Sequence, residues 1–301
     1  MSVVHIDELT YPSVLPSSSP DENLHLRLQK LNESRFRPSF PDDQWQEAIL
    51  AEVENRFAEG EFVESERREI QDRVASVPTT PDAFVAWFEE LKETGPGQND
   101  PLFPWLATKA TLEQFRWFLR QEVAGEAGFD DLVALTQLKL PVQAKLELAR
   151  NYWDEMGRGR EIAMHGPLLD RLAEELRLGS HPAPIVWEAT ALGNLLVALA
   201  ANRRYAFHSV GALGVVELTA PGRAAMVAAG LRRLGIAGPS RRYYSLHATL
   251  DIKHSEAWNR EVLRPLVEAN PETARPIAEG ALMRLAAGAR CFERYRRELG
   301  C

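Results

Sequence analysis

The sequence predicts an all-α protein. Apolar residues recur at the three- and four-residue spacing of amphipathic helices through most of the chain after residue 42. Segments with the strict alternation of a half-buried β-strand are absent, and glycine or proline stands between the helical segments as a stop signal. No repeat of fixed period is present. We therefore expect one large helical unit.

The first hundred residues are expected to form an arm and a helical segment. Proline and serine are dense in residues 1–22, which predicts a mobile N-terminal arm. Residues 23–100 are expected to form a helical segment that packs on the main bundle. Its first helix should begin at the acidic turn around Asp42 and end at Gly60, with a second helix in the charged stretch that follows. A third should begin at Pro81, a favourable first helical residue.

Residues 101–301 are expected to form the main bundle, after a linker with the sequence GPGQND. One helix should begin near Thr111, and another should begin at Pro141 and end at Gly157. Further helices are predicted in MHGPLLDRLAEELRLG, in two strongly apolar stretches separated near Asn202, in AAMVAAGLRRLG, in YYSLHATLDIKHSEAW and in ARPIAEGALMRLAAGARCFERYRREL.

Composition restricts the class of protein. A chain of 301 residues with 45% hydrophobic content can bury a full core. The formal net charge of −8 argues against a nucleic-acid partner, and no run approaches the roughly 18 uninterrupted apolar residues that would indicate a membrane span. Cys291 and Cys301 imply no disulfide framework, and no export signal is visible. We expect a soluble cytoplasmic protein without a nucleic-acid or membrane partner.

Three residues of the segment YYSLHATLDIKHSEAW carry the strongest functional signal in the chain. In a helix, their spacing places His247, Asp251 and His254 within about 40° of one face. Two imidazoles and a carboxylate are a ligand mixture that suits iron or manganese better than structural zinc. The same residues can occur by chance on a solvated face, but the bulky neighbours Tyr244 and Trp258 indicate burial. We interpret the triplet as half of a metal site.

A second pair of candidates, Glu155 and His165, flanks a glycine-rich break. On an unbroken helix this separation would leave the two side chains about 80° apart. Gly157 and Gly159 interrupt the helix, however, and would allow the chain to bring His165 back toward Glu155. The pair is therefore a candidate for the other half of the site.

Glu217 is the sharpest anomaly among the carboxylates. It is the only charged residue between Ala206 and Ala220, where an unpaired carboxylate would cost on the order of several kcal/mol. It should have a metal or a cation as its partner. An ion pair with Arg223 is the alternative to metal binding.

Further candidates are less specific. Glu122 and Glu126 stand one helical turn apart, and Glu122 follows the apolar face more closely. Glu122 is a candidate for an additional ligand, and a salt-bridged or exposed side chain is the alternative. Glu188 stands near a helix start, where a carboxylate complements the helix dipole, and His208 is interpreted as an ordinary histidine.

In order and spacing, the ligand candidates resemble the pattern of the haem-oxygenase-like diiron oxidase and oxygenase superfamily. The likeness covers about residues 101–270 and includes the phrases PLFPWLATKATLEQF, NYWDEMGRG, ELTAPGR and SLHATLDIKHSEAW. The six candidates that carry it are Glu155, His165, Glu217, His247, Asp251 and His254.

The resemblance implies a haem-oxygenase-like seven-helix bundle, with the N-terminal helical segment added to it. It implies two iron ions held by the six candidates, an external electron donor, and O2 as co-substrate, bound as a peroxide that bridges two ferric ions. Some members of the superfamily carry an extra glutamate ligand, and Glu122 would take that role here.

The resemblance also implies oxidation of a small molecule. We favour N-oxygenation of an amine or amino-acid-like substrate in specialised metabolism. C–C cleavage, decarboxylation or desaturation of an amino or fatty acid is the main alternative. A metal-free, all-α interaction protein with a polar core is the non-enzymatic alternative, and the sequence leaves open whether the chain forms a homodimer.

Overall fold

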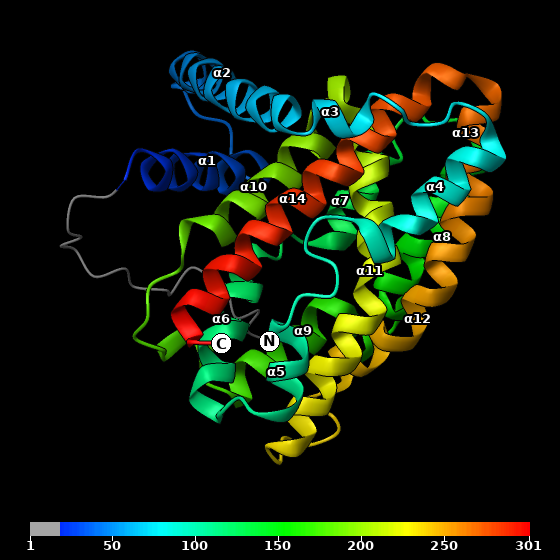
Figure 1. Cartoon of the computed structure of the whole chain (residues 1–301). Coiled ribbons are helices and arrows are strands. Elements are labelled where there is room, and N and C mark those ends of the chain that lie inside the picture. The colour runs from blue at the N-terminus through cyan, green and yellow to red at the C-terminus, as the bar shows by residue number, and fades with distance from the viewer. Residues whose placement is uncertain (1–18) are drawn as a thin grey trace.

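The computed structural model describes residues 19–301, and every regular element within them is a helix (Figure 1). The predicted all-α class is therefore confirmed. The predicted arm lies outside the described residues, except that its last residues already belong to the first helix. The α-helices are α1 (Pro20–Phe36), α2 (Trp45–Glu69), α3 (Gln71–Val74), α4 (Pro81–Thr94), α5 (Leu102–Thr108), α6 (Leu112–Gly125), α7 (Phe129–Thr136), α8 (Val142–Glu155), α9 (His165–Glu175), α10 (Trp187–Ala201), α11 (Ala206–Arg233), α12 (Arg242–Trp258), α13 (Arg264–Ala269) and α14 (Ala274–Leu299).

Helix α11 is the centre of the bundle and packs most extensively against α12 and α14 (Figure 1). Small residues allow the backbones of α11 and α14 to touch. A Cβ atom on Gly211 would overlap the carbonyl oxygen of Ile277, and one on Gly280 would overlap the carbonyl oxygen of His208. This close approach fixes the position of α11, which carries Glu217, relative to α14.

Three expectations about helix boundaries were wrong. Helix α1 was not predicted, because its charged sequence has little helical periodicity, although Ser19 caps it by accepting a hydrogen bond from the Glu22 N–H. Gly60 does not end α2, because Phe62 and Val63 beyond it are buried and continue the helix. The expected break before AAMVAAGLRRLG is also absent.

Pro221 lies inside α11 and does not end it. A proline lacks the N–H that would bond to the carbonyl four residues earlier, here that of Glu217. The helix continues because its second half is held in the core by Val227 and Leu231, both essentially inaccessible to solvent. Packing therefore outweighs the local preference of the proline.

Helix α2 projects from the bundle with α1 (Figure 1). The apolar positions in its first half are exposed, and only its second half contributes buried side chains, beginning near Glu59. The exposed side chains are Trp45, Ile49, Leu50, Val53 and Phe57.

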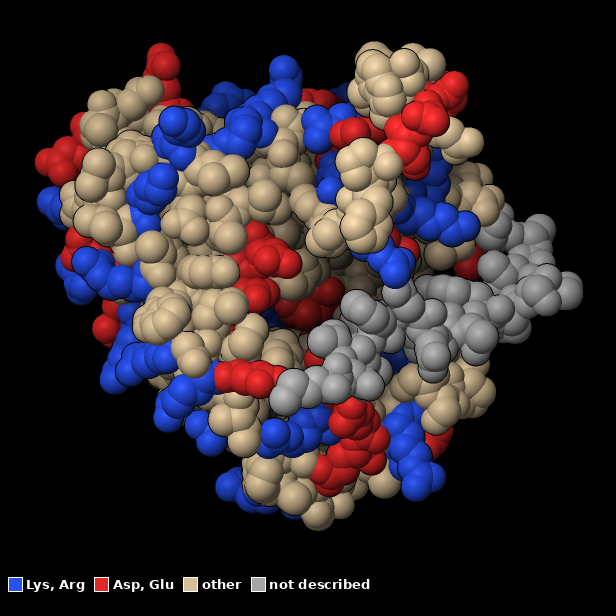
Figure 2. All heavy atoms as spheres, turned by 180° about the vertical axis from the view of Figure 1, so that it is seen from behind, with Lys and Arg blue, Asp and Glu red and all other residues tan. Residues whose placement is uncertain are grey.

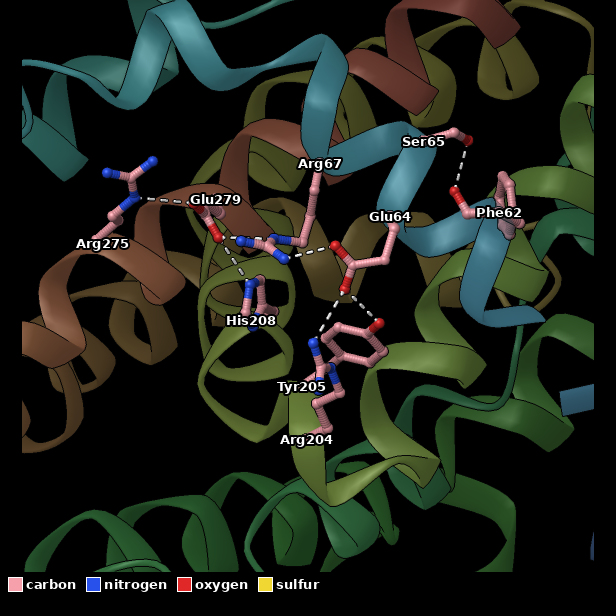
Figure 3. Close-up of polar contacts among 9 residues, drawn as sticks. All are labelled: Phe62, Glu64, Ser65, Arg67, Arg204, Tyr205, His208, Arg275 and Glu279. Atoms are coloured by element: carbon pink, nitrogen blue, oxygen red, sulfur yellow. Dashed lines mark hydrogen bonds and ion pairs between the residues drawn. The ribbon is translucent and has the colours of Figure 1, made fainter. Parts of the chain in front are cut away.

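A polar network at Glu279 joins this second half of α2 to the bundle (Figure 3). The Glu279 carboxylate accepts hydrogen bonds from Arg67 of α2 at 3.0 Å and from Arg275 at 3.1 Å, and lies 2.9 Å from His208 Nε2. Arg67 also pairs with Glu64, which accepts a hydrogen bond from the Tyr205 hydroxyl. Burial alone would raise the pKa of Glu279, but its hydrogen bonds to His208, Arg67 and Arg275 outweigh burial and hold the pKa at about 2.

We expect Glu279→Gln to destabilise the protein by about 2–3 kcal/mol at pH 7, because it weakens several charge-assisted contacts in a buried position. The folded pKa is below the ordinary unfolded value, so the stabilisation is fully present above about pH 4.5 and is lost as the pH falls toward 2. Urea unfolding at several pH values measures this. The difference in the free energy of unfolding between wild type and variant should become smaller below about pH 4.5. The exposed Glu268→Gln control should have the same free energy of unfolding as the wild type at every pH. A gap that stayed constant down to pH 3 would contradict the assignment.

One helical stretch, Arg203–Arg233, is long and apolar enough to cross a membrane by length and composition alone. Of its most apolar window, 56% is buried inside the protein. This stretch contains α11, and its burial is that of a core helix.

The surface carries charge of both signs. In the face shown in Figure 2, acidic side chains gather around a hollow near the middle, and Lys and Arg are spread over the rest of that face. Such an acidic rim gives a hollow a negative potential, which attracts small cations.

Candidate metal centre

A first group of possible ligands combines residues from three helices. Glu155 ends α8, His165 begins α9 and His247 lies on α12. Their carboxylate and imidazole ligand atoms all lie within 4.8 Å of one another. Glu155 and His165 are buried, and His247 is half-buried.

The glycine break brings two of these residues together, as the sequence predicted. Gly157 and Gly159 have φ values of 60° and 77°, which place them in the left-handed region that favours glycine. A Cβ atom on Gly157 would also overlap the backbone between Ala163 and Met164. The tight turn returns the chain so that His165 Nδ1 lies 2.5 Å from Glu155 Oε2.

A second group consists of Glu155, Glu217 and His254, again with ligand atoms within 4.8 Å of one another. All three side chains are buried. His254 Nδ1 lies 3.4 Å from Glu217 Oε2. Glu155 belongs to both groups, so the two groups are adjacent and share one carboxylate.

Asp251 lies beside both groups on α12. It is 2% exposed, and its Oδ1 atom has no hydrogen-bond partner among the described residues. Burial, followed by the negative charges of Glu217 and Glu155, raises the pKa of Asp251 to about 10. Asp251 therefore joins the other five predicted residues in one buried region.

The backbone fixes the orientation of His247. Its Nδ1 atom lies 2.7 Å from the carbonyl oxygen of Tyr243, so Nδ1–H donates and Nε2 keeps its lone pair. Burial, and then the neighbouring His165, lower the pKa of His247 to about 4. His247 is therefore neutral at pH 7, which is the form that binds metals.

His254 is held from both sides. Its Nε2 atom lies 3.2 Å from Asp154 Oδ2, and its Nδ1 atom faces Glu217. Burial alone would lower the pKa of His254, but Glu217 and Asp154 outweigh burial and raise it to about 9. A carboxylate on the second ring nitrogen is a common partner of a metal-binding histidine, because it fixes the ring and the tautomer.

The sequence comparison decides the family. Residues 116–289 match the family of iron-containing redox enzymes, which covers more than half of the chain. The chain belongs to this family. The matched segment includes the five residues of the two groups and also Asp251.

The fold of this iron-containing redox enzyme is shared with a solved structure. The crystal structure of a CADD-like protein of unknown function from Nostoc punctiforme matches it with a TM-score of 0.56 at 20% sequence identity. The match covers 73% of this chain and 98% of the other. At this identity the likeness supports the haem-oxygenase-like fold alone. No curated protein matches the sequence.

The donor atoms of the enzyme fit iron. Buried Asp251 Oδ1 has no hydrogen-bond partner within the described part of the chain, and buried His165 Nδ1 and His254 Nδ1 face carboxylate oxygens without hydrogen-bonding geometry. Buried polar atoms of this kind need a partner, and a cation would also relieve the repulsion among the neighbouring carboxylates. Imidazole nitrogen and carboxylate oxygen are ligands that suit iron.

Two residues that orient the candidates were not identified from the sequence. Asn151, one turn before Glu155 on α8, donates a hydrogen bond from Nδ2 to Glu217 Oε1 at 2.5 Å. Asp154 holds His254 and also pairs with Arg158. Their only signal in the sequence was their position close to Glu155. That position does not indicate that α11 and α12 pack against the same face of α8.

The contacts of Glu217 exclude an ion pair with Arg223. The expected alternative for this residue was an ion pair with Arg223, but its carboxylate contacts Asn151 and His254 instead. Arg223 donates to the Thr219 hydroxyl at 2.7 Å and lies over the ring of Phe292.

Glu122 lies apart from both groups. Burial raises its pKa, while the nearby charges of Arg223 and Arg284 oppose that rise. The charge of Glu126, the residue directly after α6, raises the pKa of Glu155. Glu122 therefore interacts electrostatically with the two arginines, and the structure gives no support to its predicted role as a ligand.

A cavity of about 220 Å³ adjoins the ligand groups. It is lined by Glu155, His165, Glu217, His247 and Asp251, and also by Arg223 and Arg284. Apolar side chains make up much of the remaining wall, which excludes bulk water from the groups that react. These side chains are Phe103, Phe129, Leu169, Leu192, Val216, Val227 and Phe292.

Proposed function

We propose that this enzyme is a non-haem diiron oxidoreductase that uses O2 to oxidise a small molecule. The observation that carries the proposal is the position of Glu155 in both ligand groups. A carboxylate shared by two adjacent groups has the arrangement of a bridge between two metal ions. Glu155, His165 and His247 would hold one iron, and Glu217 and His254 would hold the other with Asp251 beside them.

The iron would supply the electrons that reduce O2, and an external donor would return them. In N-oxygenation, one oxygen atom enters an N–H bond of the amine and the other leaves as water. An external donor provides the two electrons and solvent the two protons that balance this reaction. The partners that the proposal requires are therefore a small-molecule substrate and an electron donor.

The surrounding residues have definite tasks in this proposal. The Tyr243 carbonyl and the Asp154 carboxylate hold His247 and His254 in orientation. Asn151 fixes one oxygen of Glu217 and leaves the other for a metal. Positions fixed in this way need no rearrangement when iron binds.

Two carboxylates favour an amine as the group that is oxidised. Glu126 and Asp130 line the cavity near Glu155 and offer acceptors for the N–H groups of an amine. Burial, before any other cause, raises the pKa of Glu126, which makes it a better acceptor of the proton that an ammonium group must lose before its nitrogen reacts. C–C cleavage or desaturation remains the second candidate because the apolar walls also suit a carbon chain.

Anaerobic reconstitution with ferrous iron tests the proposal. We expect about two irons per chain in the wild type and fewer in His247→Ala, since an imidazole ligand is lost. On exposure to 18O2 with an amine panel and a chemical reductant, an N-oxygenated product should carry the label. Loss of hydrogen or of carbon dioxide without label would favour the second candidate. Less than one iron per chain, unaffected by His247→Ala, would indicate a metal-free interaction protein instead.

A further inference from the structure

We infer that Arg223 and Arg284 form an anion site that anchors the carboxylate of the substrate in the cavity beside the ligand groups. This inference rests on the proposed function, because it specifies what that reaction acts on. The substrate class is an amine whose chain ends in a carboxylate.

The two arginines come from different helices and meet at one place. Arg223 of α11 has its guanidinium carbon 5.4 Å from the centre of the Phe292 ring. On α14, Arg284 extends along the helix toward the same ring, because a Cβ atom on Gly288 would lie 2.8 Å from Arg284 Nη1 and 3.8 Å from Phe292 Cζ. The two cations therefore lie together over one stretch of α14.

The protein provides acceptors for few of the hydrogen-bond donors of the two arginines. Arg284 makes no hydrogen bond or close ion pair with a described residue, and its Nε atom is buried without a partner. Arg223 makes one hydrogen bond, to Thr219. A guanidinium group carries five N–H donors, so most of the donors of the pair are available to a ligand.

The electrostatics of the pair favour an anion. Burial, followed by the charge of Arg284, lowers the pKa of Arg223 to about 10, which reflects two like charges held together away from water. Glu122 partly balances both charges, and Glu126 also acts on Arg284. A planar carboxylate can accept paired hydrogen bonds from guanidinium groups and would complete this balance.

The backbone positions of Arg223 and Glu217 set the scale of the substrate. Arg223 stands six residues after Glu217 on α11, so their backbones are about 9 Å apart along the helix axis. A substrate held by its carboxylate at the arginines would reach the metal centre with an amine several bonds away. The cavity volume of about 220 Å³ fits such a small molecule.

Binding of a series of ω-amino acids, each paired with its neutral amide, tests the inference. The series runs from β-alanine to 8-aminooctanoate, and calorimetry measures each dissociation constant in iron-free protein and in anaerobic ferrous protein. We expect at least one acid to bind about 10- to 100-fold more tightly than its amide, since the amide loses charge-assisted hydrogen bonds. If no acid in the series binds more tightly than its amide, the inference is wrong.

Two variants locate the effect at the arginines. Arg284→Met removes one guanidinium group, and Gly288→Ala displaces the end of the Arg284 side chain without touching its charge. Both should reduce the preference for the acid to less than about threefold, and Arg232→Met, an exposed arginine on the same helix as Arg223, should not. A preference that survives both variants would overturn the assignment.

The outcome is independent of the iron. If the acid is preferred in protein that binds no iron, the anion site stands and the diiron proposal fails. If iron binds and is active but no acid is preferred, the diiron proposal stands and the anion site fails.

Discussion

Glu155→Ala is expected to abolish binding of both irons while leaving the fold intact. Glu155 is the one residue that both ligand groups contain, so its removal takes a ligand from each. It is 4% exposed, and burial, together with the charge of Glu217, raises its pKa well above the ordinary value. Removing it relieves repulsion among buried carboxylates, so the metal-free protein should not lose stability through charge.

Thermal unfolding under anaerobic conditions separates these two effects. Ferrous iron at 100 times its dissociation constant should stabilise the wild type by about 2.7 kcal/mol for each bound ion, because it binds only the folded state. The stabilisation by iron should be absent in Glu155→Ala. The exposed Glu174→Ala on α9 should keep the full shift. Retention of two irons by Glu155→Ala would contradict the shared-ligand arrangement.

Variants of residues that belong to only one ligand group test the same arrangement. His165 belongs only to the first group and His254 only to the second. We therefore expect His165→Ala and His254→Ala each to retain about one iron per chain, whereas Glu155→Ala retains none. Loss of both irons in every variant would instead indicate a site that assembles only as a whole.

Most residues of the candidate metal centre could be picked out from the sequence because their signals are local, and their role as metal ligands stays a prediction. The triplet on α12 follows from helical geometry, and the return of His165 to Glu155 follows from two glycines that end a helix. Glu217 was recognisable because a lone carboxylate in an apolar run requires a partner. Which partner it has could not be read, since Asn151 and His254 reach it from other helices.

The parts that sequence missed depend on contacts between distant segments. The arginines whose charges act on Glu122 come from α11 and α14, so the sequence around Glu122 could not indicate them, and its role as a ligand stays a prediction. Helix α11 continues through Pro221, and α2 through Gly60, because residues beyond each point are buried. A glycine or proline does not end a helix when burial of the residues beyond it stabilises the helix by more than the low helix propensity of that residue destabilises it.

Gly280→Ala is expected, like Gly211→Ala, to be among the most destabilising single methyl additions in the core. Its Cβ atom would overlap the carbonyl carbon and oxygen of His208 on α11. A backbone carbonyl within a helix cannot rotate away, so α11 and α14 would have to separate along their length. We expect a loss of about 3 kcal/mol or more in the free energy of unfolding, measured with urea.

Gly60→Ala is the matched control, since its Cβ atom would meet nothing within 4 Å and Gly60 also lies inside a helix. That variant should be unchanged or more stable by up to about 1 kcal/mol, because alanine is the better helix former. Equal stability of Gly280→Ala and the wild type would show that the two helix backbones do not touch. Where Gly280→Ala still folds, separation of α11 from α14 should also move Arg223 away from Arg284. The preference for a carboxylate should then fall even though every donor atom of the anion site remains.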